Sequence, residues 1–157
     1  MFAAGAGPGS GPERKQTVDL GAALKCIEAA QELGVDRFVI VSSIGTQDAV
    51  MRTPPNPMRE YLEAKAAADD ALRTSGLSWT IVKPGGLTDE PGSGTVDLAT
   101  ALGRRGPVSR DNVALTLYHV LISDNTIRTE FELFDGPTPI DVAVQSLQRG
   151  DGPVNVL

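Results

Sequence analysis

A tyrosine and a lysine lie four residues apart in the segment YLEAK, at Tyr61 and Lys65. In a helix, this spacing places both side chains on one face, about one turn apart. A free tyrosine hydroxyl has a pKa of about 10, and a nearby ammonium group favours its phenolate form. The pair could therefore act as a general acid or base near neutral pH. The alternative is an ordinary amphipathic helix with a packed tyrosine and a solvated lysine.

Two further segments favour the chemical interpretation. The apolar run RFVIVSS ends in Ser42 and Ser43, and the run LSWTIVKPGG ends in a proline and two glycines. Both runs are typical of strands buried on both faces, as in a parallel sheet. Ligands of open α/β sheets bind at the carboxyl ends of the strands. The serines, the glycine turn and the Tyr61–Lys65 pair are therefore expected at one edge of the sheet.

Other reactive side chains are interpreted as structural. His119 lies in an apolar helical segment, and no carboxylate is spaced to orient it as a base. Cys26 is expected to be a small core residue. No group of residues has metal-ligand spacing, so no metal site is predicted. The serines lack the GxSxG context of a hydrolase nucleophile. Two acidic pairs are interpreted as solvated surface: Asp69 with Asp70, and Asp89 with Glu90.

The elements that must position these residues alternate between strand and helix. Strands are expected at about 1–4, 37–43, 77–86 and 128–134, and helices at about 17–33, 57–76, 110–123 and 138–148. Asn56 is suited to cap the second of these helices and Ser109 the third. This alternation predicts the α/β class, with a doubly wound, Rossmann-like parallel sheet.

Composition narrows the function further. A chain of 157 residues is long enough for one domain, and its net charge of −6 argues against nucleic acid and anionic membrane partners. The single cysteine and the absence of a signal-like amino terminus favour a cytoplasmic location. The glycine-rich opening FAAGAGPGSGPE fits neither GxGxxG nor a P-loop in any register, so it is not interpreted as a phosphate loop.

Four segments together resemble the atypical short-chain dehydrogenase/reductases, the NAD(P)-binding, NmrA-like group related to nucleotide-sugar epimerases. They are FAAGAGPGSGPE, DLGAALKCIEAAQELGVDRFVIVSSIG, YLEAKAAADDALRTSGLSWTIVKPGGL and VSRDNVA. The resemblance implies a catalytic set of Ser43, Tyr61 and Lys65, in which the serine orients a carbonyl or hydroxyl substrate, the tyrosine transfers the proton and the lysine grips the nicotinamide ribose. The implied cofactor is NAD(P), contacted by Ala3, Ala4, Gly5, Ser42, Tyr61, Lys65, Pro84, Gly85, Gly86 and Leu87.

In that family a TGxxGxxG turn and its strand precede the segment that matches FAAGAG. Residues 1–157 are therefore expected to form one domain that corresponds to the carboxyl-terminal two thirds of a Rossmann-like domain, incomplete at its amino terminus. That turn would bind the pyrophosphate of NAD(P), so a fragment unable to bind the cofactor is one alternative for this chain, and its exposed sheet edge could pair with a second copy. An oxidoreductase or epimerase is the first functional hypothesis. The alternatives are a non-catalytic dinucleotide sensor, a fragment unable to bind cofactor, and a generic binding module.

Overall fold

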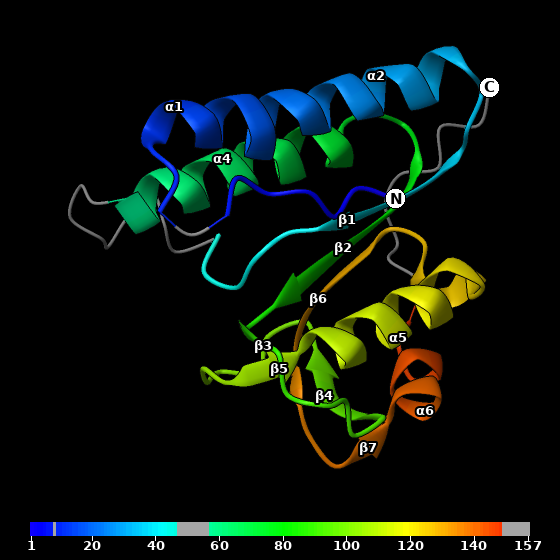
Figure 1. Cartoon of the computed structure of the whole chain (residues 1–157). Helices are drawn as coiled ribbons and strands as arrows, with labels where there is room; N and C mark the ends of the chain where they lie inside the picture. Colours follow the sequence, from blue (N-terminus) through cyan, green and yellow to red (C-terminus); the bar gives the residue numbers. More distant parts are fainter. Residues whose placement is uncertain (8, 47–56, 149–157) are drawn as a thin grey trace.

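The computed structural model describes residues 1–7, 9–46 and 57–148, and Figure 1 shows the arrangement of the elements. The first long helix is continuous through α1 (Pro12–Arg14), the π-helical segment η1 (Lys15–Ala22) and α2 (Ala23–Glu32). It therefore begins about five residues earlier than the apolar periodicity predicts. It ends before Gly34, whose φ of +67° is the left-handed conformation typical of a glycine that follows a helix.

The other helices follow the prediction closely. α4 spans Pro57–Arg73, α5 spans Arg110–Leu121, the 3₁₀ turn η2 spans Asp124–Thr126 and α6 spans Ile140–Gln145. The predicted cap of α5 is confirmed, because Ser109 Oγ accepts a hydrogen bond of 3.1 Å from the Asn112 amide. The proposed cap Asn56 lies outside the described residues.

The main sheet has the strand order β1-β2-β6-β4-β7. β1 (Arg37–Val41), β2 (Ser78–Pro84) and β6 (Thr129–Asp135) run parallel, as predicted. β4 (Thr95–Ala99) runs antiparallel to β6, and the short β7 (Thr138–Pro139) runs antiparallel to β4. The sequence analysis predicts neither of these two strands, because both are short and one lies in a segment rich in turn residues. The sheet is therefore mainly, but not wholly, parallel.

A second, two-stranded sheet joins β3 (Gly86–Thr88) to β5 (Pro107–Ser109). The amino-terminal segment, expected to be a strand, makes only one bridge to β1. There, Phe2 exchanges backbone hydrogen bonds of 2.8 and 2.9 Å with Val39 and Val41. This bridge places residues 2–5 beside the carboxyl half of β1.

Helices cover both faces of the sheet, which confirms the doubly wound α/β architecture (Figure 1). Side chains alternate along each strand, so Phe38 and Ile40 of β1 pack against α2 and α4, whereas Val39 packs toward α5 and α6. In β2, Ile81 packs in the core on the side of α2 and α4, and Val82 packs in the core on the side of α5 and α6. No helix in the described ranges is long and apolar enough to cross a membrane.

Two minor predictions about side chains are wrong. Cys26 is exposed rather than part of the core, because the buried face of α2 is formed by Ala23, Ile27 and Ala30. The apolar spacing of residues 110–123 also predicts that Leu121 shares one helical face with Val113, Leu117 and Val120, but Leu121 is 40% exposed in the last turn of α5, whereas the other three are buried.

Candidate functional site

Helix α4 presents four polar side chains to the interior at intervals of four residues: Tyr61, Lys65, Asp69 and Arg73. This spacing keeps them on one helical face. The Lys65 Nζ lies 5.9 Å from the centroid of the Tyr61 ring, so the prediction that these two side chains share a face is confirmed. The first two residues lie at the carboxyl end of β1, and the last two lie deeper, above the body of the sheet.

Lys65 is almost completely buried, at 3% exposure. Its ammonium group forms an ion pair with Asp19 Oδ1 at 3.3 Å and donates hydrogen bonds to the carbonyls of Ala4 at 3.3 Å and Val41 at 3.2 Å. A buried ammonium requires such partners, because it has left the water that would otherwise solvate it. Lys65 thereby ties the amino-terminal segment and the end of β1 to α4.

Asp19 is the central residue that the sequence analysis missed. Its side chain is fully buried, and Oδ2 accepts a hydrogen bond of 3.2 Å from the Ala6 amide. A Cβ at Gly5 would lie 3.1 Å from Asp19 Oδ1, so the glycine leaves room for the carboxylate. One signal was present: Asp19 lies on the same helical face as the apolar Ala23 and Ile27, where a charged side chain needs a buried partner.

Tyr61 is half-buried, and its surroundings raise the pKa of its hydroxyl above the ordinary value of 10.0. Burial makes the largest contribution, and the negative charges of Asp19 and Asp69 add to it, whereas a hydrogen bond with the Ser43 side chain acts in the opposite direction. The sequence analysis expects Lys65 to lower this pKa. The net shift is opposite, chiefly because burial disfavours the phenolate, and also because the Asp19 carboxylate that pairs with Lys65 adds a negative charge nearby. Tyr61 and Ser43, distant in sequence, thus lie near each other.

The ends of β1 and β2 lie side by side at this edge. The Ile44 amide, next to Ser43, donates to the Pro84 carbonyl at 3.2 Å, and the Gly86 amide donates to the Gly106 carbonyl at 3.1 Å. A Cβ at Gly85 would lie only 2.1 Å from the Gly106 oxygen, so this position requires glycine.

The structure brings most of the predicted cofactor residues to this edge. Ala3, Ala4, Gly5, Gly86 and Leu87 are exposed there.

Ser42, like the predicted cofactor-binding residues Lys65 and Pro84, is buried. It is 3% exposed, and its hydroxyl donates to Asp69 Oδ2 at 2.7 Å, beneath the edge rather than on it. Asp69 is fully buried, which contradicts its interpretation as a surface carboxylate, whereas its neighbour Asp70 is exposed. The helix turns by about 100° per residue, so one member of the pair faces the sheet and the other faces solvent.

Asp69 belongs to a second buried polar cluster. Glu130 Oε2, on β6, accepts from Lys83 at 2.7 Å and from Arg73 at 2.6 Å. Burial raises the pKa of Asp69 from 3.8 to about 6, although the Ser42 hydrogen bond and the positive charges of Lys83 and Arg73 act in the opposite direction. Burial also acts to raise the pKa of Glu130, but the hydrogen bonds from Lys83 and Arg73 lower it below its ordinary value.

The remaining candidates do not join either cluster. His119 is half-buried, with its ring 5.3 Å from that of Tyr118, consistent with a structural role. Asp89 and Glu90 are exposed, as predicted. Within the described ranges, no three histidine, cysteine or acidic side chains are grouped so that they could hold a metal ion.

Comparison with known proteins identifies an NAD(P)H-binding family and an epimerase relative. A family model described as NAD(P)H-binding matches residues 1–124. An uncharacterised sugar epimerase of Bacillus subtilis, YhfK, is 42% identical over 147 residues, which cover 94% of this chain and 67% of that protein.

Two solved structures show the same architecture. A candidate NAD-dependent epimerase/dehydratase from Bacillus halodurans is 38% identical with a TM-score of 0.87, and the match covers 92% of this chain and 67% of that one. The oxidoreductase ylbE from Lactococcus lactis is 28% identical with a TM-score of 0.81, with coverages of 92% and 68%. The chain thus spans about two thirds of the length of each of these relatives.

Proposed function

Since the chain belongs to the NAD(P)H-binding family, and within it to the epimerase-related atypical short-chain dehydrogenase/reductases, we propose that it acts on a small carbonyl or hydroxyl compound through Ser43, Tyr61 and Lys65. The observation that carries this proposal is the grouping of the three side chains at the carboxyl edge of the sheet: Lys65 Nζ lies 5.9 Å from the centroid of the Tyr61 ring, and Ser43 is near enough to Tyr61 to influence its pKa. Two neighbouring hydroxyl groups can both bind one substrate oxygen.

The residues of this edge fit the nicotinamide half of the cofactor. The backbone from Ala3 to Gly5 is exposed beside β1, and Gly86 is exposed with open space where a Cβ would lie. A flat ring and its ribose can approach backbone closely only where side chains are small or absent. When bound, NAD(P) supplies or accepts the hydride. We assign its contacts to Ala3, Ala4, Gly5, Pro84, Gly85, Gly86 and Leu87.

Tyr61 is assigned the proton transfer to or from the substrate oxygen, and Ser43 is assigned the orientation of that oxygen. The raised pKa of Tyr61 keeps its hydroxyl protonated near neutral pH, which suits a proton donor in the direction of carbonyl reduction. The Lys65 ammonium lies close to the Tyr61 ring and holds Ala4 in place. Its hydrogen bonds of 3.2 and 3.3 Å to two carbonyls are long, so a ribose hydroxyl could replace one of them.

The experiment compares wild type with Tyr61→Phe in NADPH and NADH oxidation with a panel of small aldehydes and ketones. Loss of the proton donor is expected to lower turnover by about 10²- to 10⁴-fold. Cofactor affinity, measured by NADPH fluorescence, should change by less than about threefold, because the phenol ring remains and can still pack against its neighbours. Tyr118→Phe is the matched control, since Tyr118 is exposed on α5. Equal turnover in wild type and Tyr61→Phe would refute the assignment of the proton transfer.

A non-catalytic dinucleotide sensor is the second candidate. The observation in its favour is that the Lys65 charge is already paired with Asp19, while the pKa of Tyr61 is raised rather than lowered. A sensor would bind NADPH or NADH without turnover on any carbonyl of the panel. Absence of binding to either nucleotide at millimolar concentration would exclude both functions for this chain.

A further inference from the structure

Arginines in and just after the loop between β4 and β5 differ in whether an acidic side chain pairs with them. The Arg104 guanidinium pairs with Asp97 and lies 4.9 Å from the centroid of the Phe134 ring. Arg110, which begins α5, pairs with Asp89 at 2.8 Å. Arg105, between them in sequence, is exposed and has no ion-pair or hydrogen-bond partner among the described residues. Asp97 and Asp89 are thus paired with other arginines, and the Arg105 charge is left unpaired within the part of the chain that the structure describes, in a chain with a net charge of −6.

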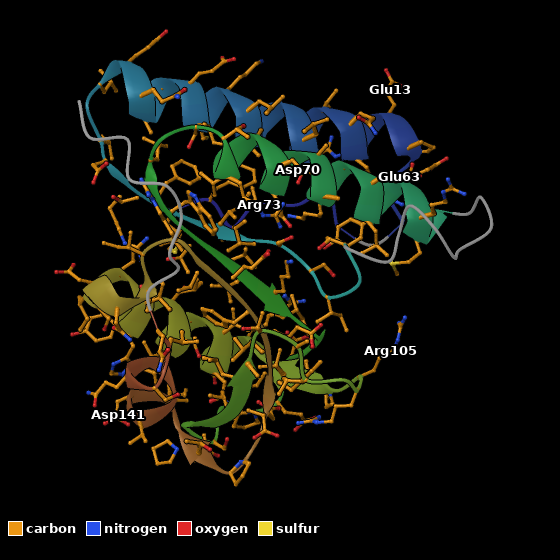
Figure 2. All side chains as sticks on the ribbon, turned by 180° about the vertical axis from the view of Figure 1, so that it is seen from behind. Glu13, Glu63, Asp70, Arg73, Arg105 and Asp141 are labelled. Atoms are coloured by element: carbon orange, nitrogen blue, oxygen red, sulfur yellow. The ribbon has the colours of Figure 1, made fainter. Side chains whose placement is uncertain are left out.

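Backbone hydrogen bonds place the loop that carries Arg105 at the same edge as Ser43. The Ile44 amide donates to the Pro84 carbonyl, and the Gly86 amide donates to the Gly106 carbonyl. Gly106 directly follows Arg105 in the sequence. The close approach of Gly85 to the Gly106 carbonyl holds the loop against the end of β2. In Figure 2 the labelled Arg105 side chain projects from this loop toward the side of the molecule on which α4 begins, where Glu63 is labelled.

We propose that Arg105 binds an anionic group, a carboxylate or a phosphate, on the substrate of this site. The proposal rests on the proposed function and names its substrate class: carbonyl or hydroxyl compounds with a negative charge remote from the reacting carbon. A guanidinium suits this role because its planar array of donors matches the oxygens of carboxylate and phosphate in a bidentate manner. Arg104 and Arg110, which pair with Asp97 and Asp89, cannot serve without losing those partners.

The test measures binding of two matched probe pairs to the ¹⁵N-labelled full chain by NMR titration at constant ionic strength. Pyruvate is compared with methyl pyruvate, and dihydroxyacetone phosphate with dihydroxyacetone, so that the members of each pair differ in the charged group. At least one charged probe is expected to bind about tenfold more tightly than its neutral partner, because hydrogen bonds to a charged group are stronger. The pair that responds identifies carboxylate or phosphate as the preferred group.

Arg105→Gln should reduce this preference to within about twofold, because glutamine keeps donors but loses the charge. Arg110→Gln is the matched control and should retain the preference. An equal loss in both variants would attribute the effect to the general electrostatic field and overturn the proposal. So would the absence of any preference, or weaker NADPH binding by Arg105→Gln in the absence of probe, which would assign the charge to the cofactor.

Tyr61→Phe separates this proposal from the proposed function. The variant should keep the preference for the charged probe even though it loses turnover. Turnover of neutral carbonyls in wild type without any preference for the charged probes would refute the anion site and leave the enzyme assignment intact.

Discussion

Two buried charged clusters lie along one face of α4, and they differ in what they leave accessible. The Lys65–Asp19 pair lies beside exposed backbone and the hydroxyl groups of Ser43 and Tyr61. The second cluster joins Asp69, Lys83, Glu130 and Arg73 with the Ser42 hydroxyl, beneath the edge. Burial raises a pKa at both places, that of Tyr61 beside the first cluster and that of Asp69 in the second. A perturbed pKa alone therefore does not distinguish a reactive site from a structural network. Accessibility of the groups to a ligand does distinguish them.

The largest expected effect on stability is at Lys65, in the first cluster. Lys65→Met should destabilise the protein by about 3 to 5 kcal/mol, because it leaves the Asp19 carboxylate buried without its counter-charge. The free energy of unfolding in urea measures this effect. The double variant with Asp19→Asn should recover part of the loss, since it removes the uncompensated charge.

The matched control is Arg110→Met, which breaks an ion pair between side chains that are 58% and 88% exposed. An exposed pair is worth about 1 kcal/mol or less. If Lys65→Met were no more destabilising than this control, the Lys65–Asp19 pair would not be the structural link described above.

The pH dependence of stability tests the role of Asp69 in the second cluster. Because the folded pKa of Asp69 is raised to about 6, the folded state binds more protons than the unfolded state between that value and the ordinary 3.8. Stability from this group is therefore present at low pH and is lost as the pH rises through about 6. Relative to Asp69→Asn, wild type should lose roughly 2 to 3 kcal/mol between about pH 4 and pH 7.

Asparagine can still accept the hydrogen bond from Ser42. The difference between the pH profiles of stability for wild type and Asp69→Asn therefore reports the titration of the Asp69 carboxyl group. Urea unfolding at several pH values provides the measurement. Asp70→Asn, at the exposed neighbouring position, should follow the wild-type profile. Parallel profiles for wild type and Asp69→Asn would contradict the assigned pKa of Asp69.

Glu130→Gln should destabilise the protein by about 2 kcal/mol, because it removes the negative charge that faces Lys83 and Arg73. The effect is expected to be smaller than at Lys65, since the Asp69 carboxylate remains near both cations. The variant should also lower the pKa of Asp69, because Glu130 acts to raise it. NMR titration of the Asp69 side-chain carboxyl carbon measures this shift, and an increase would show that the two carboxyl groups are not coupled as described.

The smallest expected effect concerns the glycine beside Asp19. Gly5→Ala would introduce a Cβ at 3.1 Å from Asp19 Oδ1 and should cost about 1 kcal/mol through overpacking. Gly86→Ala is the control, because a Cβ there would meet nothing within 4 Å. Thermal unfolding compares the two variants, and equal midpoints would indicate that the Asp19 carboxylate is free to shift.

The parallel core of the fold could be predicted because its strands are continuous apolar runs and its helices have clear periodicity and termination signals. The antiparallel β4 and β7 could not be predicted, since short strands in turn-rich segments have no distinctive pattern. For the site, the Tyr61–Lys65 relation followed from helical spacing alone. The partnership of Lys65 with Asp19 did not, because the two residues belong to different helices and no local rule relates them.

Taken by itself, the sequence determined which residues share a helical face, where the parallel strands end and the family to which those segments are similar. These are local properties of spacing, turn chemistry and residue type. Only the tertiary structure decided which charges lie buried together. It placed Asp19 against Lys65, turned Asp69 inward and Asp70 outward, and left Arg105 without an ion-pair or hydrogen-bond partner among the described residues. Desolvation and pairing depend on what faces a side chain across the core, and that is decided by packing between distant segments.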